Sequence, residues 1–191
     1  DRLCEGNCVI EKAGHGTVTI GSIEKYITDT AWDNNWVKPI KINKELKFSI
    51  GIIGAGPAGL AAAEMLRIKG YKITIYDRYD RIGGLLIYGI PNFKLEKEIV
   101  IRRTKRLIES GIKFKLNCDI GKNVHFKEIR KKHDAVLIST GTYKAKKTSI
   151  DAQGLKKIIP ALEYLIASNK KKLGDYVEKY SSGELNAKGK K

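Results

Sequence analysis

No run of apolar residues in this 191-residue chain approaches the roughly 20 that cross a bilayer, so the sequence predicts no membrane span. An initiator methionine and a signal-peptide pattern are also missing, and the start at Asp1 is typical of the cut end of a longer protein. Three cysteines, an odd number, exclude a disulfide framework. We find no internal repeat. What remains is a globular domain with extra segments, whose 42% hydrophobic content can form a core.

Acidic residues are scarce, since 21 of them stand against 37 lysines and arginines, for a net charge of +16. Nucleic-acid binders usually cluster their basic residues and interleave aromatics. Here the lysines are scattered, with an excess near the C-terminus, so we interpret them first as solvated faces. A basic surface that docks an acidic partner ranks second, and nucleic acid a distant third. The three histidines are spread through loops and polar stretches, and no catalytic acid, base or nucleophile is predicted.

The middle of the chain alternates between two periodicities. Short apolar runs rich in β-branched residues predict buried parallel strands, and amphipathic stretches between them predict helices. The sequence therefore predicts an α/β fold with a parallel sheet, Rossmann-like, over residues 47–168. Residues 1–46 carry few periodic signals apart from a helix that opens near Ser22, and residues 169–191 predict a flexible basic tail. The predicted strands fall near 48–53, 72–76, 112–116 and 135–141, and the helices near 60–67, 96–110 and 160–168.

A glycine turn, Gly54-Ala55-Gly56-Pro57-Ala58-Gly59, joins the first predicted strand to a helix. In such a turn the first glycine permits the tight bend, the second lets backbone approach a pyrophosphate, and the third allows close helix packing. The next strand ends in Asp77, about 20 residues on, where a carboxylate reaches a ribose hydroxyl. Strand, turn, helix and acid together predict a dinucleotide-binding unit.

The dinucleotide is predicted to be FAD rather than NAD. Pro57 lies within the turn, and a second glycine pair, Gly83-Gly84, follows the second strand. That pair can bring backbone near the phosphates and ribityl chain of a flavin. Thr140 and Gly141, at the carboxyl end of the last strand, predict a further close approach.

Several longer stretches resemble one family. They are Asp1 to Cys8, Thr17 to Tyr26, the glycine turn, Gly83 to Leu95, Gly141 to Lys144 and Pro160 to Leu165. Over residues 1–168 the chain resembles the small (beta) chain of the glutamate synthase family, or the equivalent C-terminal region of a fused glutamate synthase. It is similar too to the N-terminal half of dihydropyrimidine dehydrogenase.

That resemblance implies an oxidoreductase in which electrons run from NADPH to FAD and through 4Fe-4S clusters. They would reach a large (alpha) chain carrying FMN, where glutamate forms from glutamine and 2-oxoglutarate, in the cytoplasm or an organelle. It also implies that residues 1–46 are the remnant of a helical iron–sulfur domain. Cys4 and Glu24 would serve one cluster and Cys8 the other, with the remaining ligands upstream. An NADPH domain is expected after residue 191, so this piece alone is expected to be inactive.

Motif and resemblance together give the expected FAD contacts. Lys94 matches a basic position that contacts FAD in the family, and Ile120 would meet the adenine mainly through backbone. The full set is Gly54, Ala55, Gly56, Pro57, Ala58, Gly59, Asp77, Arg78, Gly84, Leu85, Lys94, Ile120, Thr140 and Gly141.

Two alternatives stay open. One is a related NADPH-dependent flavin and iron–sulfur oxidoreductase of the dihydropyrimidine dehydrogenase kind, against which the Gly84-to-Pro91 stretch argues. The other is a docking domain that keeps the fold but binds no flavin, against which the intact glycines and Asp77 argue.

Overall fold

The computed structural model describes residues 5, 7–146, 158–187 and 189. The chain divides into two compact units, Asp1–Pro39 and Ile40–Lys191, which are described separately. The sequence predicted a boundary a few residues later, between 46 and 47. The first unit contains the short helix α1 (Val9–Lys12) and the longer helix α2 (Ile20–Asp33).

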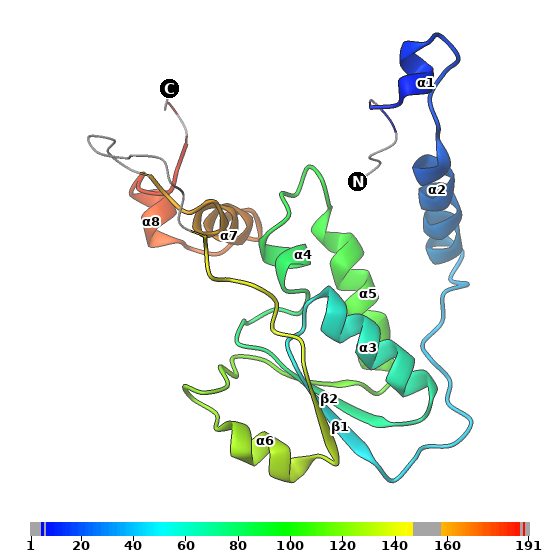
Figure 1. The fold of residues 1–191 in the computed structure, drawn as a ribbon, viewed down its shortest axis with the longest axis vertical. Helices are drawn as coiled ribbons and strands as arrows, with labels where there is room; N and C mark the ends of the chain where they lie inside the picture. The colour runs from blue at the N-terminus through cyan, green and yellow to red at the C-terminus, as the bar shows by residue number, and fades with distance from the viewer. Residues whose placement is uncertain (1–4, 6, 147–157, 188, 190–191) are drawn as a thin grey trace. The chain divides into compact units, whose positions relative to one another are not determined.

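The second unit is built on a four-stranded parallel sheet (Figure 1). Its strands are β1 (Ser49–Ile53), β2 (Lys72–Tyr76), β3 (Lys113–Lys115) and β4 (Ala135–Ile138), in the order β3-β2-β1-β4. The connecting helices are α3 (Pro57–Ile68), α4 (Leu85–Tyr88), α5 (Lys97–Glu109) and α6 (Phe126–Lys132). The predicted Rossmann-like fold with a parallel sheet is confirmed.

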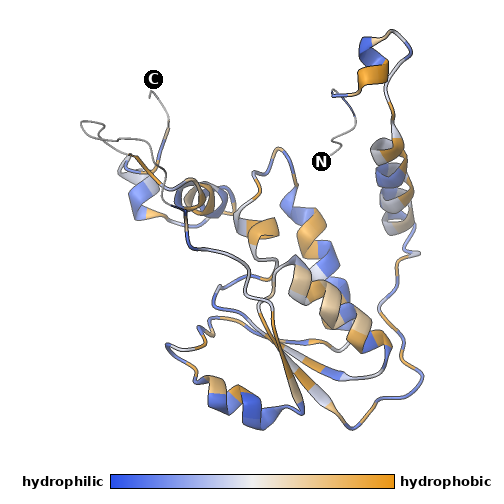
Figure 2. Ribbon diagram, viewed as in Figure 1, coloured by the Kyte–Doolittle hydropathy of each residue, from blue (hydrophilic) through white to orange (hydrophobic). Residues whose placement is uncertain are grey.

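The core lies between one face of the sheet and helices α3 and α5. Ile52, Ile73 and Ile75 alternate along β1 and β2, so they point to the same side of the sheet. They pack against Leu60 and Leu107 of the two helices, and Figure 2 shows the apolar residues concentrated along these strands. Burial of each large aliphatic side chain contributes about 1.5–3 kcal/mol, which fixes the strand–helix layers that carry the glycine turn.

Close packing around the glycine turn requires two of its glycines. Gly54 has a φ of 112°, and a Cβ there would overlap the backbone oxygen of Ser139, just beyond β4. A Cβ on Gly59 would overlap the Gly54 oxygen. The turn therefore lies tightly against the ends of β1 and β4. Because the chain leaves β1 toward β2 on one side and receives β4 on the other, this is the switch point where such sheets bind ligands.

Helix α7 (Ala161–Lys172) lies where a helix was predicted near 160–168, but it runs on into the stretch from residue 169 that was predicted to be a flexible tail, and helix α8 (Glu178–Ser181) lies within that stretch. Asn169 and Leu185 are both buried. The side-chain amide of Asn169 donates to the Tyr88 oxygen over 2.9 Å, and Asp175 pairs with Arg81. These contacts, with residues 81 and 94 positions earlier in the chain, order this stretch, and local composition does not reveal them. None of the helices in the described ranges is both long and apolar enough to cross a membrane.

A buried polar contact joins β2 to the segment before β4, on the face of the sheet away from α3. The Tyr76 hydroxyl lies 2.9 Å from Nε2 of His133, whose ring fills the space where Gly51 has no side chain. Nδ1 of His133 is buried and has no hydrogen-bond partner among the described residues. Burial lowers the pKa of His133 below its ordinary value of 6.5, which favours the neutral ring at neutral pH.

We predict that this histidine makes folding stability fall as the pH drops below about 6.5. Below that pH His133 is protonated in the unfolded chain but not yet in the folded protein. The loss of folding stability therefore begins at the pKa of the unfolded state and continues down to the lower pKa of the folded state. The His133→Phe variant keeps a ring over Gly51 and should lose less stability than wild type between about pH 7.5 and pH 5.5. Urea unfolding at both pH values measures this, with the exposed His125→Gln variant as control. Equal pH slopes for wild type and His133→Phe would contradict the assignment.

Candidate dinucleotide-binding site

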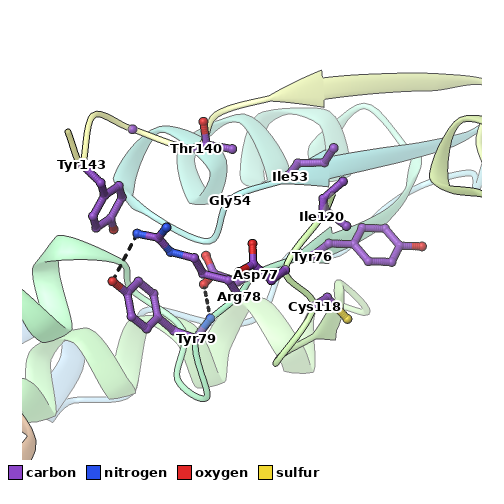
Figure 3. Close-up of a pocket in the computed structure, with 12 residues that line it drawn as sticks. Ile53, Gly54, Tyr76, Asp77, Arg78, Tyr79, Cys118, Ile120, Thr140 and Tyr143 are labelled. Carbon is purple, nitrogen blue, oxygen red and sulfur yellow. Dashed lines mark hydrogen bonds between the residues drawn. The ribbon is translucent and has the colours of Figure 1, made fainter. Parts of the chain in front are cut away.

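A cavity of about 250 Å³ opens at the carboxyl ends of β1, β2 and β4 (Figure 3). Gly54 of the turn and Asp77 after β2 lie at its centre, and the loop after β3 forms one wall. Six predicted site residues meet here, although they come from four separate parts of the sequence. The lining consists of Ile53, Gly54, Tyr76, Asp77, Arg78, Tyr79, Cys118, Asp119, Ile120, Thr140, Gly141 and Tyr143.

Asp77 ties the end of β2 to the glycine turn. Asp77 is only 8% exposed, and its Oδ2 accepts a 2.6 Å hydrogen bond from the Ala55 N–H. Its Oδ1 accepts from the Tyr79 N–H over 2.8 Å. A carboxylate offers about four lone-pair sites, so acceptor capacity remains for a ligand hydroxyl. Asp77 thus shapes the turn as well as facing the cavity, a second role that the motif did not predict.

The loop after β3 is held against the Asp77 segment by two backbone hydrogen bonds. The Cys118 N–H donates to the Asp77 oxygen over 2.8 Å, and the Asn117 N–H donates to the Tyr79 oxygen over 3.0 Å. These bonds bring Cys118 and Ile120 to the cavity wall. Ile120 had been predicted there. No motif in the sequence pointed to Cys118, which is half-buried at the cavity wall.

An arginine held between two tyrosines forms the opposite wall. The Arg78 guanidinium lies 4.0 Å from the ring centroid of Tyr143 and 4.9 Å from that of Tyr79. Its Nη2 also donates to the Tyr79 hydroxyl over 3.2 Å. Such cation–π contacts hold the planar cation in place at the cavity (Figure 3). Neither tyrosine was predicted as a site residue. The only hint was that Tyr143 lies within a stretch, Gly141 to Lys144, that carries the family resemblance.

The two glycine segments come together beside this cavity. The Gly83 N–H donates to the Ala55 oxygen over 3.0 Å. Gly84 has a φ of 53°, and a Cβ there would lie 2.8 Å from the Gly56 Cα. A Cβ on Gly56, in contrast, would meet nothing within 4 Å. Backbone therefore faces open space at the first turn of α3, where helix N–H groups lack partners in the helix and the dipole is positive.

The remaining predicted residues lie around that first turn and farther along the chain. Pro57 and Ala58 are exposed in the first turn of α3, and Leu85 begins α4. Lys94 is exposed in the loop between Pro91 and α5, and its N–H donates to the Pro91 oxygen. It lies outside the set of residues that line the cavity. The Lys94 contact remains a proposal.

The predicted cluster ligands belong to the first unit. Cys4 lies outside the described residues. Cys8 is the residue before α1, where backbone N–H groups, that of Val18 foremost, lower the pKa of its thiol. Glu24 is exposed on α2. Within the described ranges, no three His, Cys, Asp or Glu side chains gather as a metal site. The residues that the structure describes therefore do not complete a cluster site.

Comparison with protein-family models gives two matches. Residues 1–36 match the model for the 4Fe-4S cluster domain II of dihydropyrimidine dehydrogenase. Residues 52–91, which span the glycine turn, Asp77 and the second glycine pair, match an NAD(P)-binding Rossmann-like domain.

Sequence comparison with known proteins confirms the resemblance to the glutamate synthase small chain. The small chain of NADPH glutamate synthase from Azospirillum brasilense is 60% identical over 190 residues. That alignment covers 100% of this chain and 39% of the relative. The chain resembles the small chain of glutamate synthase along its whole length. The corresponding Escherichia coli small chain is 42% identical over 91% of this chain and 37% of its own length. This chain thus spans about two fifths of these glutamate synthase relatives.

A solved structure supports the fold. Mycobacterium tuberculosis FprA in complex with NADPH superposes with a TM-score of 0.57. The superposition covers 64% of this chain and 29% of the FprA chain, at 22% sequence identity. At this identity the likeness shows the Rossmann-like fold alone.

We predict that Asp77→Ala loosens the glycine turn even without a ligand. The buried N–H of Ala55 loses its acceptor, which costs about 1–3 kcal/mol. Hydrogen exchange should accelerate in peptides covering residues 54–59, and the free energy of unfolding should fall by a similar amount. Asp119→Ala is the matched control, because Asp119 lines the same cavity but pairs with the exposed Lys122 at 2.9 Å. Unchanged exchange at the turn in Asp77→Ala would show that the Ala55–Asp77 hydrogen bond does not hold the turn.

Proposed function

We propose that this chain is the FAD-holding part of an NADPH-dependent glutamate synthase. The observation that carries the proposal is the pairing of two features at one sheet edge. A buried carboxylate, Asp77, faces a cavity, and beside it the backbone at Gly56 faces open space. The first suits an adenosine ribose and the second a pyrophosphate.

Asp77 favours a dinucleotide whose adenosine ribose carries no 2′-phosphate. A second negative charge beside a buried carboxylate would be repelled, so NADP is disfavoured in this site. FAD and NAD both satisfy this condition. The second glycine segment favours FAD, because Gly84 lies against Gly56 and extends the backbone surface past the pyrophosphate.

The residues at the proposed site are of the kinds that FAD requires. N–H groups in the first turn of α3, those of Ala58 and Gly59, would hold the phosphates with the positive end of the helix. Asp77 would accept from the ribose hydroxyls, and Ile120 and Thr140 would border the adenosine. FAD, when bound, supplies the hydride and electron transfer, and the protein binds and orients it.

The whole protein, by its resemblance, would pass electrons from NADPH through FAD and iron–sulfur clusters toward glutamate formation. The substrates would be glutamine and 2-oxoglutarate. A large chain carrying FMN is the proposed partner, and the cytoplasm the proposed compartment. The relatives named above carry this part of the proposal, because they are small chains of NADPH glutamate synthase.

We predict that FAD slows alkylation of Cys118, because this thiol lines the cavity proposed for the adenosine. Peptide mass spectrometry would follow maleimide labelling of Cys118 with increasing FAD, and flavin fluorescence would report binding in the same titration. In Gly56→Leu both effects should disappear, since the new side chain fills the space proposed for the phosphates. The open space around Gly56 means that this variant should still fold, which circular dichroism would check.

NADP⁺ is the control ligand and should give little protection of Cys118 at matched concentration. FAD that binds Gly56→Leu as it binds wild type would refute the site. Protection by NADP⁺ but not FAD would instead identify a nicotinamide site.

Lys94 provides a separate prediction. If it reaches the flavin or its phosphates, Lys94→Ala should weaken FAD binding by roughly 1 kcal/mol or more, a typical cost of losing a charged hydrogen-bond donor. Lys127→Ala, at another exposed lysine, controls for the change in net charge. Equal FAD dissociation constants for wild type and Lys94→Ala would remove Lys94 from the site.

A further inference from the structure

The Gly83-Gly84 segment is packed closely on two sides, so its position is tightly constrained. It is hydrogen-bonded to the glycine turn through the Gly83 N–H, and Gly84 lies so close to Gly56 that a Cβ added at Gly84 would be only 2.8 Å from the Gly56 Cα. On the other side, a Cβ at Gly83 would lie 2.8 Å from a methyl group of Val100. A small shift of this segment would therefore change the shape of the surface proposed for the FAD phosphates.

Arg81, two residues before this pair, is held by a carboxylate from the far end of the domain. Its Nη1 lies 2.7 Å from Oδ2 of Asp175, and its Nη2 lies 2.6 Å from Oδ1. This is the bidentate arrangement in which a guanidinium fixes both distance and plane. Nη1 also donates to the Tyr88 hydroxyl over 2.9 Å, and that hydroxyl donates to Asp80. The network thus brackets Gly83-Gly84 at both ends, at Arg81 and at Tyr88.

Helix α7 also holds Tyr88, the residue at the other end of the network. The Asn169 side-chain amide donates to the Tyr88 oxygen over 2.9 Å, and Asn169 is 3% exposed. Ile166 and Leu173 pack against the cluster formed by Ile87, Tyr88 and Val100. Figure 1 shows α7 beside α4. Asp175, three residues after α7 ends, is therefore presented by a helix that is itself fixed on α4.

We propose that the Arg81–Asp175 pair is a positioning latch, by which the α7–α8 segment holds Gly83-Gly84 in register with the glycine turn for FAD. This inference rests on the proposed FAD site and deepens it. Neither residue touches the proposed cofactor position, so both act through the glycine pair. The segment that was predicted to be a flexible tail thus supports the proposed binding site without contacting the ligand.

The Arg81–Asp175 pair is expected to affect FAD affinity more than folding stability. The side chains of Arg81 and Asp175 are 31% and 26% exposed, and ion pairs with such access to water contribute little to folding. The Arg81 guanidinium holds the pKa of the Asp175 carboxyl below its ordinary value, so the pair is charged at neutral pH. Breaking it should leave the fold intact and lower FAD affinity, since more of the binding energy is then used to order the glycine pair.

The test is a double-mutant cycle on the full chain with Arg81→Gln, Asp175→Asn and the double variant. FAD dissociation constants come from flavin fluorescence, and melting temperatures come from circular dichroism. Each single variant should bind FAD at least about fivefold more weakly, the low end of coupling between sites. The double variant should bind FAD no more weakly than Arg81→Gln alone, because the Arg81–Asp175 contact is already lost in that variant. Asp175→Glu, which keeps the carboxylate, should recover part of the affinity.

Glu163→Gln is the matched control, because it breaks a 3.2 Å pair with Lys179 inside the same α7–α8 segment and does not touch Arg81. It should bind FAD as wild type does. If wild type binds FAD and Asp175→Asn binds equally well, the latch is refuted while the FAD site stands. An equal loss in Glu163→Gln and Asp175→Asn would likewise refute it, since general loosening would then explain both. A wild-type chain that binds no FAD would refute the proposed function and the latch with it.

Discussion

The hydrogen bond from the Ala55 N–H to the buried Asp77 carboxylate is the contact on which the site depends. It joins the end of β2 to the glycine turn that leaves β1, two segments that the chain separates by a whole helix. An acid in this position costs desolvation, and two backbone N–H groups offset it. With the carboxylate held there, the first turn of α3 lies beside it, so that the positions proposed for the ribose and the phosphates are set together.

Close packing at the glycines also fixes the position of the glycine turn. Gly54 and Gly59 let the turn lie against Ser139 at the end of β4, and Gly84 lets the second segment lie against Gly56. The only one of these glycines with open space in front of it is Gly56. Three glycines therefore serve packing, and the fourth faces outward. This division explains why a spaced set of glycines is informative, since replacing the packed ones changes the fold and replacing Gly56 changes only what can approach it.

Local periodicity was enough to predict the sheet. The β-branched run at 48–53 and the alternation at 72–76 lie on β1 and β2, and Gly54, Gly56 and Asp77 fell where the motif requires. Tyr79 and Tyr143 could not be predicted in the same way. They meet at Arg78 only because β4 lies next to β1, which brings a residue 64 positions away to the same wall. Lys94 illustrates the opposite case, because its expected role came from resemblance and the cavity does not include it.

The C-terminal stretch shows why composition fails as a guide to order. Residues 169–191 are rich in lysine, glycine and serine, yet a few contacts made far away in the sequence order the part that includes α8. Asn169 and Asp175 are polar, so a pattern of apolar spacing cannot reveal them, and each finds its partner in the segment between β2 and α5. That segment carries the second glycine pair. A charged surface pair adds little stability, so its value lies in geometry, and a bidentate arginine provides geometry more reliably than a flexible lysine could. On this proposal, two charged residues that look like ordinary solvated surface connect the α7–α8 segment to the proposed cofactor site.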